Sequence, residues 1–120
     1  MFGFLGSKQE TLSWPTLESE ADLERAIEAS KERPVVLFKH STRCSISFMA
    51  KARLQDAKEA DPPQIYYLDL LAHRDISNLI AERFDVVHQS PQVIVIKDGY
   101  AIYDASHGTI NMRDLIKYSK

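Results

Sequence analysis

Two hydrophobic periods alternate along the chain and predict strands and helices in turn. Continuous apolar runs rich in β-branched and aromatic residues are typical of strands buried on both faces of a sheet. Apolar residues spaced three and four apart are typical of helices that turn one face to a core. The strand-like runs cover residues 35–38, 65–71, 93–96 and 100–103, with a short alternation at 12–14, and the helical stripes lie at 23–30, 46–57, 76–84 and 115–116.

Polar residues mark where these elements begin and turn. Ser19 and Asp75 are suited to cap the first and third helices, because their side-chain oxygens can accept a hydrogen bond from a free N–H group of the first turn. Thr109 or Asn111 is suited to cap the last helix. Asp98-Gly99 separates two strand-like runs, and this dipeptide favours a two-residue hairpin turn.

The second helix is predicted to carry a single apolar face. It follows the buried run at 35–38 after a short polar loop. We expect its face to pack against the sheet through Ile46, Met49, Ala50, Leu54 and Ala57.

The order of the elements predicts the fold class. Strands joined by helices favour a parallel arrangement, whereas the final hairpin adds an antiparallel pair. The sequence therefore predicts an α/β protein, a three-layer sandwich around a mixed sheet, which is the topology of thioredoxin-like proteins. Periodicity alone leaves other small α/β folds open. We expect one domain over residues 12–120 and a flexible tail over residues 1–11.

Composition narrows the class of partner. The 120 residues amount to one domain, and 44% hydrophobic residues suffice for a core. Fifteen Lys and Arg against seventeen Asp and Glu give a net charge of -2, so no basic surplus exists to neutralise nucleic acid or an anionic membrane. We therefore expect neither nucleic acid nor a membrane as a partner.

The N-terminal residues 1–6 are apolar, but their run is too short for a signal-peptide core and follows no basic segment. No stretch of the chain approaches the length of an apolar membrane span. We therefore expect a cytoplasmic protein, and we expect it to act as a monomer.

Cysteine occurs once, at position 44, so the chain can close no disulfide within itself and can supply no Cys pair to a zinc site. Cys44 is predicted to lie where the loop after the buried strand meets the second helix. The free N–H groups and the dipole of a helix N-terminus favour a thiolate over a thiol, and Arg43, with Lys39 and His40 close in sequence, adds positive charge. A thiolate is the nucleophile of thiol–disulfide exchange.

Ser47 stands three residues after Cys44, where a dithiol exchanger has its second cysteine. Its hydroxyl is placed to donate a hydrogen bond to the thiolate, but it cannot close a disulfide. Cys-x-x-Ser therefore predicts an exchanger with one sulfur, although a free cysteine is most often a small buried hydrophobe. The four histidines show no zinc-ligand spacing, so we expect no metal.

Three segments in this order resemble the monothiol bacilliredoxin family, thioredoxin-fold proteins of the bacillithiol system. They are residues 39–47 (KHSTRCSIS), 90–92 (SPQ) and 106–107 (SH), and the resemblance runs from about residue 12 to residue 118. It implies that Cys44 is the active cysteine and that Ser90, Pro91 and Gln92 form a cis-proline loop that binds the substrate. It also implies supporting roles for His40, Ser41, Thr42, Arg43 and Ser47, with His107 as a further candidate.

The resemblance implies a reaction in which Cys44 takes bacillithiol from an S-bacillithiolated client protein as a mixed disulfide, after which a second thiol resets it. Bacillithiol is then the co-substrate, and the partners are client proteins and a low-molecular-weight thiol. The family often has Pro directly after the cysteine and an aromatic residue after Ser-His, where this chain has Ser45 and Gly108.

Two alternatives to this function stay open. A monothiol glutaredoxin-like protein would use glutathione or bind an iron–sulfur cluster shared across a dimer, although the Gly and Phe of Cys-Gly-Phe-Ser are replaced here by Ser45 and Ile46. A thioredoxin-like binding module would hold partners with its proline loop and leave Cys44 without a role.

Overall fold

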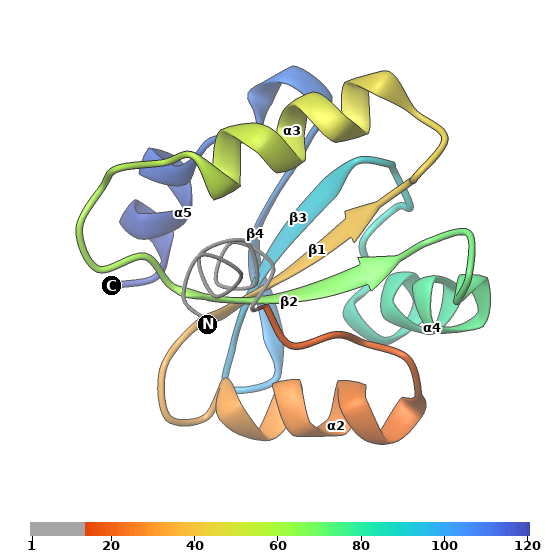
Figure 1. Ribbon diagram of the computed structural model, residues 1–120. Coiled ribbons are helices and arrows are strands. Elements are labelled where there is room, and N and C mark those ends of the chain that lie inside the picture. The colour runs from red at the N-terminus through yellow and green to blue at the C-terminus, as the bar shows by residue number, and fades with distance from the viewer. Residues whose placement is uncertain (1–13) are drawn as a thin grey trace, which may run out of the picture.

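Four strands form one mixed sheet in the computed structural model, which describes residues 14–120 (Figure 1). The strands are β1 (Val35–His40), β2 (Gln64–Asp69), β3 (Gln92–Lys97) and β4 (Tyr100–Ser106). Their order across the sheet is β2-β1-β3-β4, with β1 parallel to β2 and antiparallel to β3, and β3 antiparallel to β4. The predicted mixed sheet and its final hairpin are confirmed.

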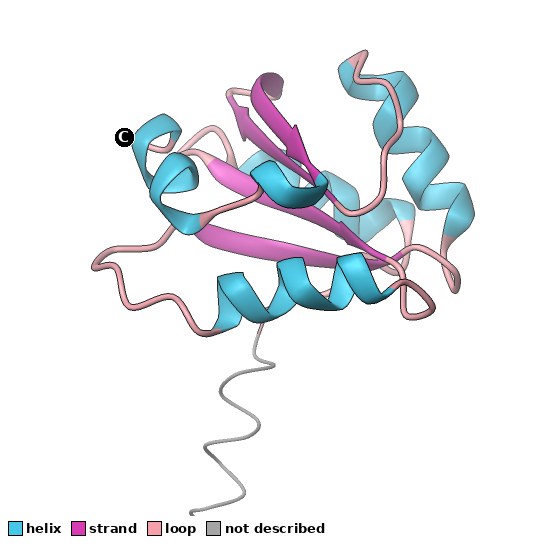
Figure 2. Cartoon of the chain, turned by 90° about the horizontal axis from the view of Figure 1, so that it is seen from above, coloured by secondary structure: helices cyan, strands magenta, loops and turns pink. Residues whose placement is uncertain are grey.

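Helices cover both faces of this sheet. They are α2 (Glu20–Ala29), α3 (Ser45–Gln55), α4 (Arg74–Phe84) and α5 (Met112–Tyr118), with a 3-10 turn, η1 (His107–Thr109). α2 and α4 lie on one face, and α3 and α5 lie on the other, as Figures 1 and 2 show. These layers confirm the predicted three-layer sandwich. No helix within residues 14–120 is both long and apolar enough to cross a bilayer.

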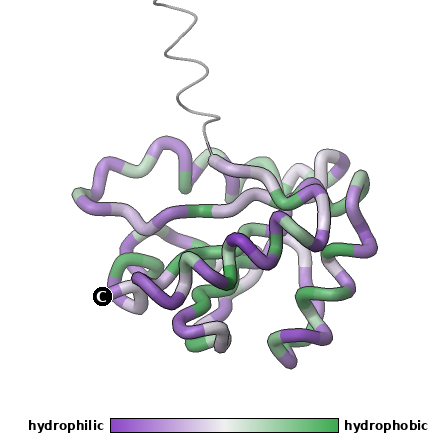
Figure 3. Tube along the Cα trace, turned by 90° about the horizontal axis from the view of Figure 1, so that it is seen from below, coloured by the Kyte–Doolittle hydropathy of each residue, from purple (hydrophilic) through white to green (hydrophobic). Residues whose placement is uncertain are grey.

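β1 lies at the centre of the core, because all six of its residues are buried. Successive side chains of a strand point to opposite faces of the sheet. Leu37 therefore packs in the cluster beneath α2 and α4, and Phe38 packs in the cluster beneath α3 and α5. Tyr66 and Tyr67 of β2 divide between the same two clusters. Along the trace in Figure 3, hydrophilic and hydrophobic segments alternate, as expected of helices with one face on a sheet.

Two predicted caps and the predicted turn are confirmed. Ser19 Oγ and Asn111 Oδ1 each accept a hydrogen bond from the backbone N–H three residues further on, at 3.2 and 2.9 Å, and so cap α2 and α5. Asp98 and Gly99 form the β3–β4 turn with φ of 52° and 81°. Both values lie in the left-handed region that Asp and Gly tolerate best.

The predicted cap of α4 is wrong. His73 holds the N-cap position, and Asp75 lies in the first turn, where its carboxylate is close to the positive end of the helix dipole. The helix begins earlier than predicted because the N–H groups of Ile76 and Ser77 already bond to the His73 carbonyl.

The predicted apolar face of α3 is partly wrong. Ala50 and Leu54 are buried, but Ile46 and Met49 are 50% and 62% exposed. The buried stripe of the helix begins at Ser47, a polar residue that is fully buried. A serine has this place because its hydroxyl accepts a hydrogen bond from the loop that precedes the helix.

The predicted tail at residues 1–11 lies outside the described residues, as does most of the predicted strand at 12–14. Within the described part, Trp14 is not in a strand, and Thr16 makes a single parallel bridge to Tyr67 of β2. The indole of Trp14 packs edge-on against Phe38, with ring centroids 5.9 Å apart.

Candidate active site

Cys44 lies at the N-terminus of α3, directly after the loop that leaves β1. It is the N-cap residue, with an extended backbone, and it is partly buried. Its N–H donates to the Ser41 carbonyl at 3.2 Å, and its own carbonyl accepts from the Phe48 N–H at 3.1 Å, the first bond of the helix. The first turn of α3 holds no acidic residue. The sulfur therefore stands at the positive end of an eleven-residue helix, with no carboxylate in that turn to oppose a thiolate.

Ser47 anchors the loop that carries Cys44. Its side chain is fully buried, and its Oγ accepts a hydrogen bond from the Ser41 N–H at 2.9 Å. The same Oγ lies 2.7 Å from Nδ1 of His40. The donor in this second hydrogen bond depends on the tautomer of His40, because a hydroxyl can both donate and accept. The sequence interpretation has the hydroxyl donate to the thiolate, whereas in the described residues the hydrogen-bond partners of Ser47 Oγ are Ser41 and His40.

His40 is a buried, neutral member of this network. Burial lowers the pKa of its imidazole, and the positive charge of Lys51 lowers it further. Its ring packs edge-on against Phe48 at 4.8 Å between centroids, and its Nε2 is buried without a hydrogen-bond partner. No histidine within residues 14–120 is hydrogen-bonded to Cys44, so the site has no Cys–His pair of the kind that hydrolases use.

The remaining residues of the loop before Cys44 differ in burial. Ser41 is partly buried, and its Oγ accepts from the Arg43 N–H at 3.4 Å. Thr42 and Arg43 are exposed. The structure thus brings His40, Ser41 and Ser47 together beneath the cysteine and leaves the other two on the outer side of the loop.

Lys39 does not add charge beside the thiol, contrary to what its place in the sequence suggests. It points to the opposite face of the sheet, where it is fully buried, and its Nζ donates to the Ser77 carbonyl of α4 at 3.2 Å. The alternation of strand side chains carries this signal, because residues 38 and 40 share one face and residue 39 has the other. Since His40 is neutral, the positive character near Cys44 comes from the helix N-terminus and Arg43.

A cis-proline lies at the same end of the sheet as Cys44. The Ser90-Pro91 bond is cis. Lys39 at the end of β1 pairs with Gln92 at the start of β3, so the loop before β3 and the loop after β1 leave the sheet side by side. The Pro91 carbonyl accepts from the His107 N–H at 3.1 Å, which ties η1 to this loop. The cis bond that the resemblance implied is confirmed.

Gln92 is buried, whereas His107 is exposed. Gln92 is 1% exposed; its Nε2 donates to the Val87 carbonyl at 3.0 Å, and its Oε1 accepts from the Gln89 N–H at 3.4 Å. The side chain of His107 is exposed. Both residues line a cavity of about 520 Å³ between the loop and η1. Their roles in substrate binding, like those of the other supporting residues, stay predictions.

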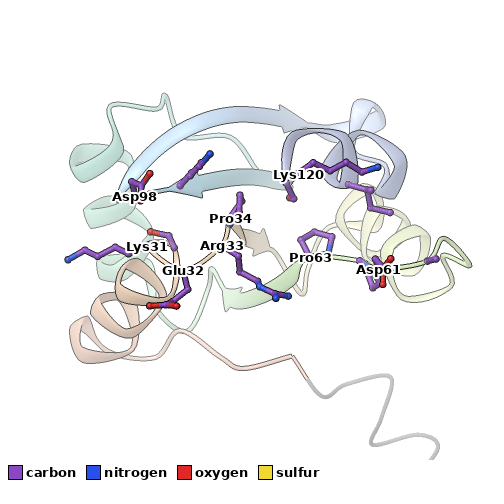
Figure 4. A pocket seen from close by; sticks show the side chains of 14 residues that line it. Lys31, Glu32, Arg33, Pro34, Asp61, Pro63, Asp98 and Lys120 are labelled. Atoms are coloured by element: carbon purple, nitrogen blue, oxygen red, sulfur yellow. The ribbon is translucent and has the colours of Figure 1, made fainter.

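A larger cavity lies away from Cys44. Figure 4 shows a cavity of about 580 Å³ whose lining includes Arg33, Pro34 and Asp98. Since Arg33 and Pro34 precede β1 and Cys44 follows it, this cavity is at the opposite end of the sheet. Within residues 14–120, no group of three His, Cys, Asp or Glu side chains is placed to hold a metal ion.

The central strand of a mixed sheet leads to a cysteine at a helix N-terminus, and a cis-proline lies at the same end of that sheet. These features define a thioredoxin-fold protein of the thiol oxidoreductase type. The chain belongs to the monothiol bacilliredoxin family, since the family profile described as monothiol bacilliredoxin BrxC matches residues 15–115. The resemblance found in the sequence is confirmed.

Solved structures agree with this fold. One, described as having a thioredoxin fold, is 31% identical over 86% of this chain and 90% of its own, with a TM-score of 0.76. The reduced thioredoxin pre-protein of Schistosoma mansoni is 20% identical, covers 89% of this chain and 98% of its own, and has a TM-score of 0.72. The thioredoxin of Fasciola hepatica is 23% identical over 87% and 94%, with a TM-score of 0.65.

Proposed function

We propose that the protein removes bacillithiol from S-bacillithiolated proteins by a cycle that uses one protein sulfur. The Cys44 thiolate attacks the bacillithiol sulfur of the mixed disulfide. A bond forms between Cys44 and bacillithiol, the bond to the client breaks, and the client leaves as a thiolate that takes up a proton. A second thiol, either bacillithiol or another reductant, then attacks the sulfur of the bound bacillithiol and releases Cys44 as a thiolate.

The observation that carries this proposal is the position of the Ser47 side chain. Where a dithiol exchanger has its resolving sulfur, this chain has an oxygen that is fully buried and bonded to Ser41 and His40. Because a hydroxyl cannot form a disulfide, Ser47 cannot resolve the mixed disulfide on Cys44. An external thiol must do so, which is the cycle of a monothiol exchanger and supports bacillithiol as co-substrate for a member of this family.

The partners of the proposed reaction are bacillithiolated client proteins and the low-molecular-weight thiol, and the proposed compartment is the cytoplasm, where free thiols are kept reduced. The exposed side chains of Thr42 and Arg43 leave the loop before the cysteine open to a client of protein size.

The test is release of the client thiol. A model client that carries one bacillithiolated cysteine and a matched client that carries glutathione are each mixed with the protein, and the freed client thiol is followed by mass spectrometry. The proposal expects faster release from the bacillithiolated client, and no release above background by C44S. Faster release from the glutathionylated client would support the glutaredoxin-like alternative, and no release from either would favour a binding module.

A further inference from the structure

The segment that carries the cis-proline is held by side chains more than by its backbone. We call residues 85–91 the proline loop. At its ends, the Val86 N–H bonds to the Ala81 carbonyl, and the Pro91 carbonyl accepts from His107. Between these points, residues 87–90 make no backbone–backbone hydrogen bond with any other part of the described chain. Two buried side chains of the sheet hold this stretch, those of Gln92 and Lys39.

Lys39 reaches the proline loop from the centre of the sheet. Its Nζ lies 3.1 Å from Nδ1 of His88 and donates to the Ser77 carbonyl at 3.2 Å. Because an ammonium can only donate, Nδ1 of His88 is the acceptor of this contact. The Ser77 Oγ lies 3.4 Å from the same nitrogen. Lys39 and Ser77 are both fully buried, so the contact joins β1, α4 and the loop behind the sheet.

The charges that act on His88 are positive. Burial lowers the pKa of Lys39 to about 8. Burial also lowers the pKa of His88, and the charges of Lys39 and of Arg74 at the start of α4 lower it further. Within residues 14–120, no carboxylate forms an ion pair with Lys39. An ammonium buried without a counter-ion costs stability, and an apolar side chain of similar length would avoid that cost. A gain in the stability of the fold therefore does not explain this contact, whereas the positioning of the proline loop does.

We propose that Lys39 is a positioning residue that fixes the proline loop through His88 and thereby sets the affinity of the site for its client. The inference rests on the proposed function, because it concerns how that same site receives the client. Lys39 acts through the loop and touches neither Cys44 nor the reacting sulfur atoms. Its loss should weaken client binding and leave the reactivity of the thiol as it is.

The first test compares K39M with K97M, which makes the same change at an exposed lysine at the end of β3. Release of bacillithiol from the model client is measured against client concentration. We expect K39M to raise the KM for the client about tenfold, the effect of one charge-assisted hydrogen bond, with little change in kcat. We expect K97M to match the wild type, and the rate of Cys44 alkylation by iodoacetamide to be the same in all three proteins. An unchanged KM, or a fall in kcat alone, would overturn the inference.

The second test removes the other partner of the contact and keeps the inference open to refutation if K39M folds poorly. His88 is exposed in the loop, so H88A leaves the core intact. We expect H88A to raise KM as K39M does. The double variant K39M/H88A should raise it no further, because each single change already removes the contact between Lys39 and His88. Effects that multiply in the double variant would show that Lys39 does not act through His88.

A structural readout separates this inference from the proposed function. Hydrogen exchange of the Gln89 amide should be about tenfold faster in K39M than in K97M if Lys39 holds the loop. Equal exchange would overturn the inference whatever the activity. If exchange responds as expected but the wild type releases no bacillithiol, the proposed function fails, and the claim about client affinity is rejected with it.

Discussion

Two loops meet at the active end of the sheet, and they are held in chemically different ways. The cysteine loop, residues 41–44, is anchored by the hydroxyl of Ser47, which bonds to the Ser41 N–H and to the neutral imidazole of His40. The proline loop, residues 85–91, is anchored on the other face by the ammonium of Lys39 and the amide of Gln92. One anchor is uncharged and the other includes a buried charge.

Because the two loops have different anchors, the reactivity of the thiol and the binding of the client depend on different residues. A neutral anchor beneath Cys44 leaves the helix N-terminus and Arg43 as the positive groups near the sulfur. The charged anchor acts behind the sheet, on the loop that we propose receives the client. We therefore expect changes in one network to leave the other intact.

The largest effect is expected from C44S, which removes the chemistry without moving either loop. Exchange requires the sulfur itself, so release of bacillithiol from the model client should fall to the uncatalysed rate. The thermal midpoint and the exchange of the Gln89 amide should match the wild type. Its control is S45A, at an exposed position beside the cysteine, which should keep full activity. Residual catalysis by C44S would mean that another group carries the reaction.

The next effect concerns the charged anchor and depends on pH. The pKa of Lys39 is lowered by burial from 10.5 to about 8, so between these values the unfolded chain binds more protons than the folded one. Stability therefore rises with pH across this window, by roughly 3 kcal/mol in all, and it is flat below it. K39M should lack this rise. Urea unfolding followed by the fluorescence of Trp14, from pH 7 to 10.5, measures the difference between the two proteins; parallel curves would contradict the buried ammonium.

A smaller loss is expected when the neutral anchor is cut. S47A leaves the Ser41 N–H and Nδ1 of His40 without their partner, which should lower the free energy of unfolding by about 1–3 kcal/mol. The Gln89 amide in the proline loop should exchange at the wild-type rate. S45A is again the matched control, since it deletes an exposed hydroxyl two residues away in the same helix. Equal stability of S47A and S45A would show that the cysteine loop does not depend on this anchor.

The smallest effect is expected from a charge that belongs to neither loop. Glu24 of α2 and Arg83 of α4 form an ion pair at 2.9 Å on the surface, and both side chains are about half exposed. E24Q should leave the KM for the client close to the wild-type value, because exposed pairs contribute little. A change in KM as large as that of K39M would mean that charge on this face of the sheet acts generally and not through His88.

Much of the fold could be predicted from the sequence because local patterns carry it. The apolar run at β1, the Asp98-Gly99 turn and the caps Ser19 and Asn111 depend on neighbours in sequence, and all of them are present in the structure. The position of Cys44 at a helix start follows from the same kind of pattern.

The two anchors could not be predicted because they depend on partners brought together by the fold. A serine three residues after a cysteine can turn to the sulfur or to the preceding loop, and the path of the backbone at Ser41 decides between them. A lysine at the end of an apolar run suggests an exposed strand end. Only the pairing of β1 with β3 and the packing of α4 bury Lys39 beside Ser77 and His88.

The most direct test of the central claim is the mass of the protein after reaction with bacillithiol disulfide. We predict one bacillithiol adduct, located on Cys44 by peptide mapping, that forms faster on the native protein than on a denatured control and is cleared by free bacillithiol. No adduct on Cys44, or an adduct that forms equally fast on the denatured protein, would contradict the claim that this fold activates a single sulfur for exchange with bacillithiol.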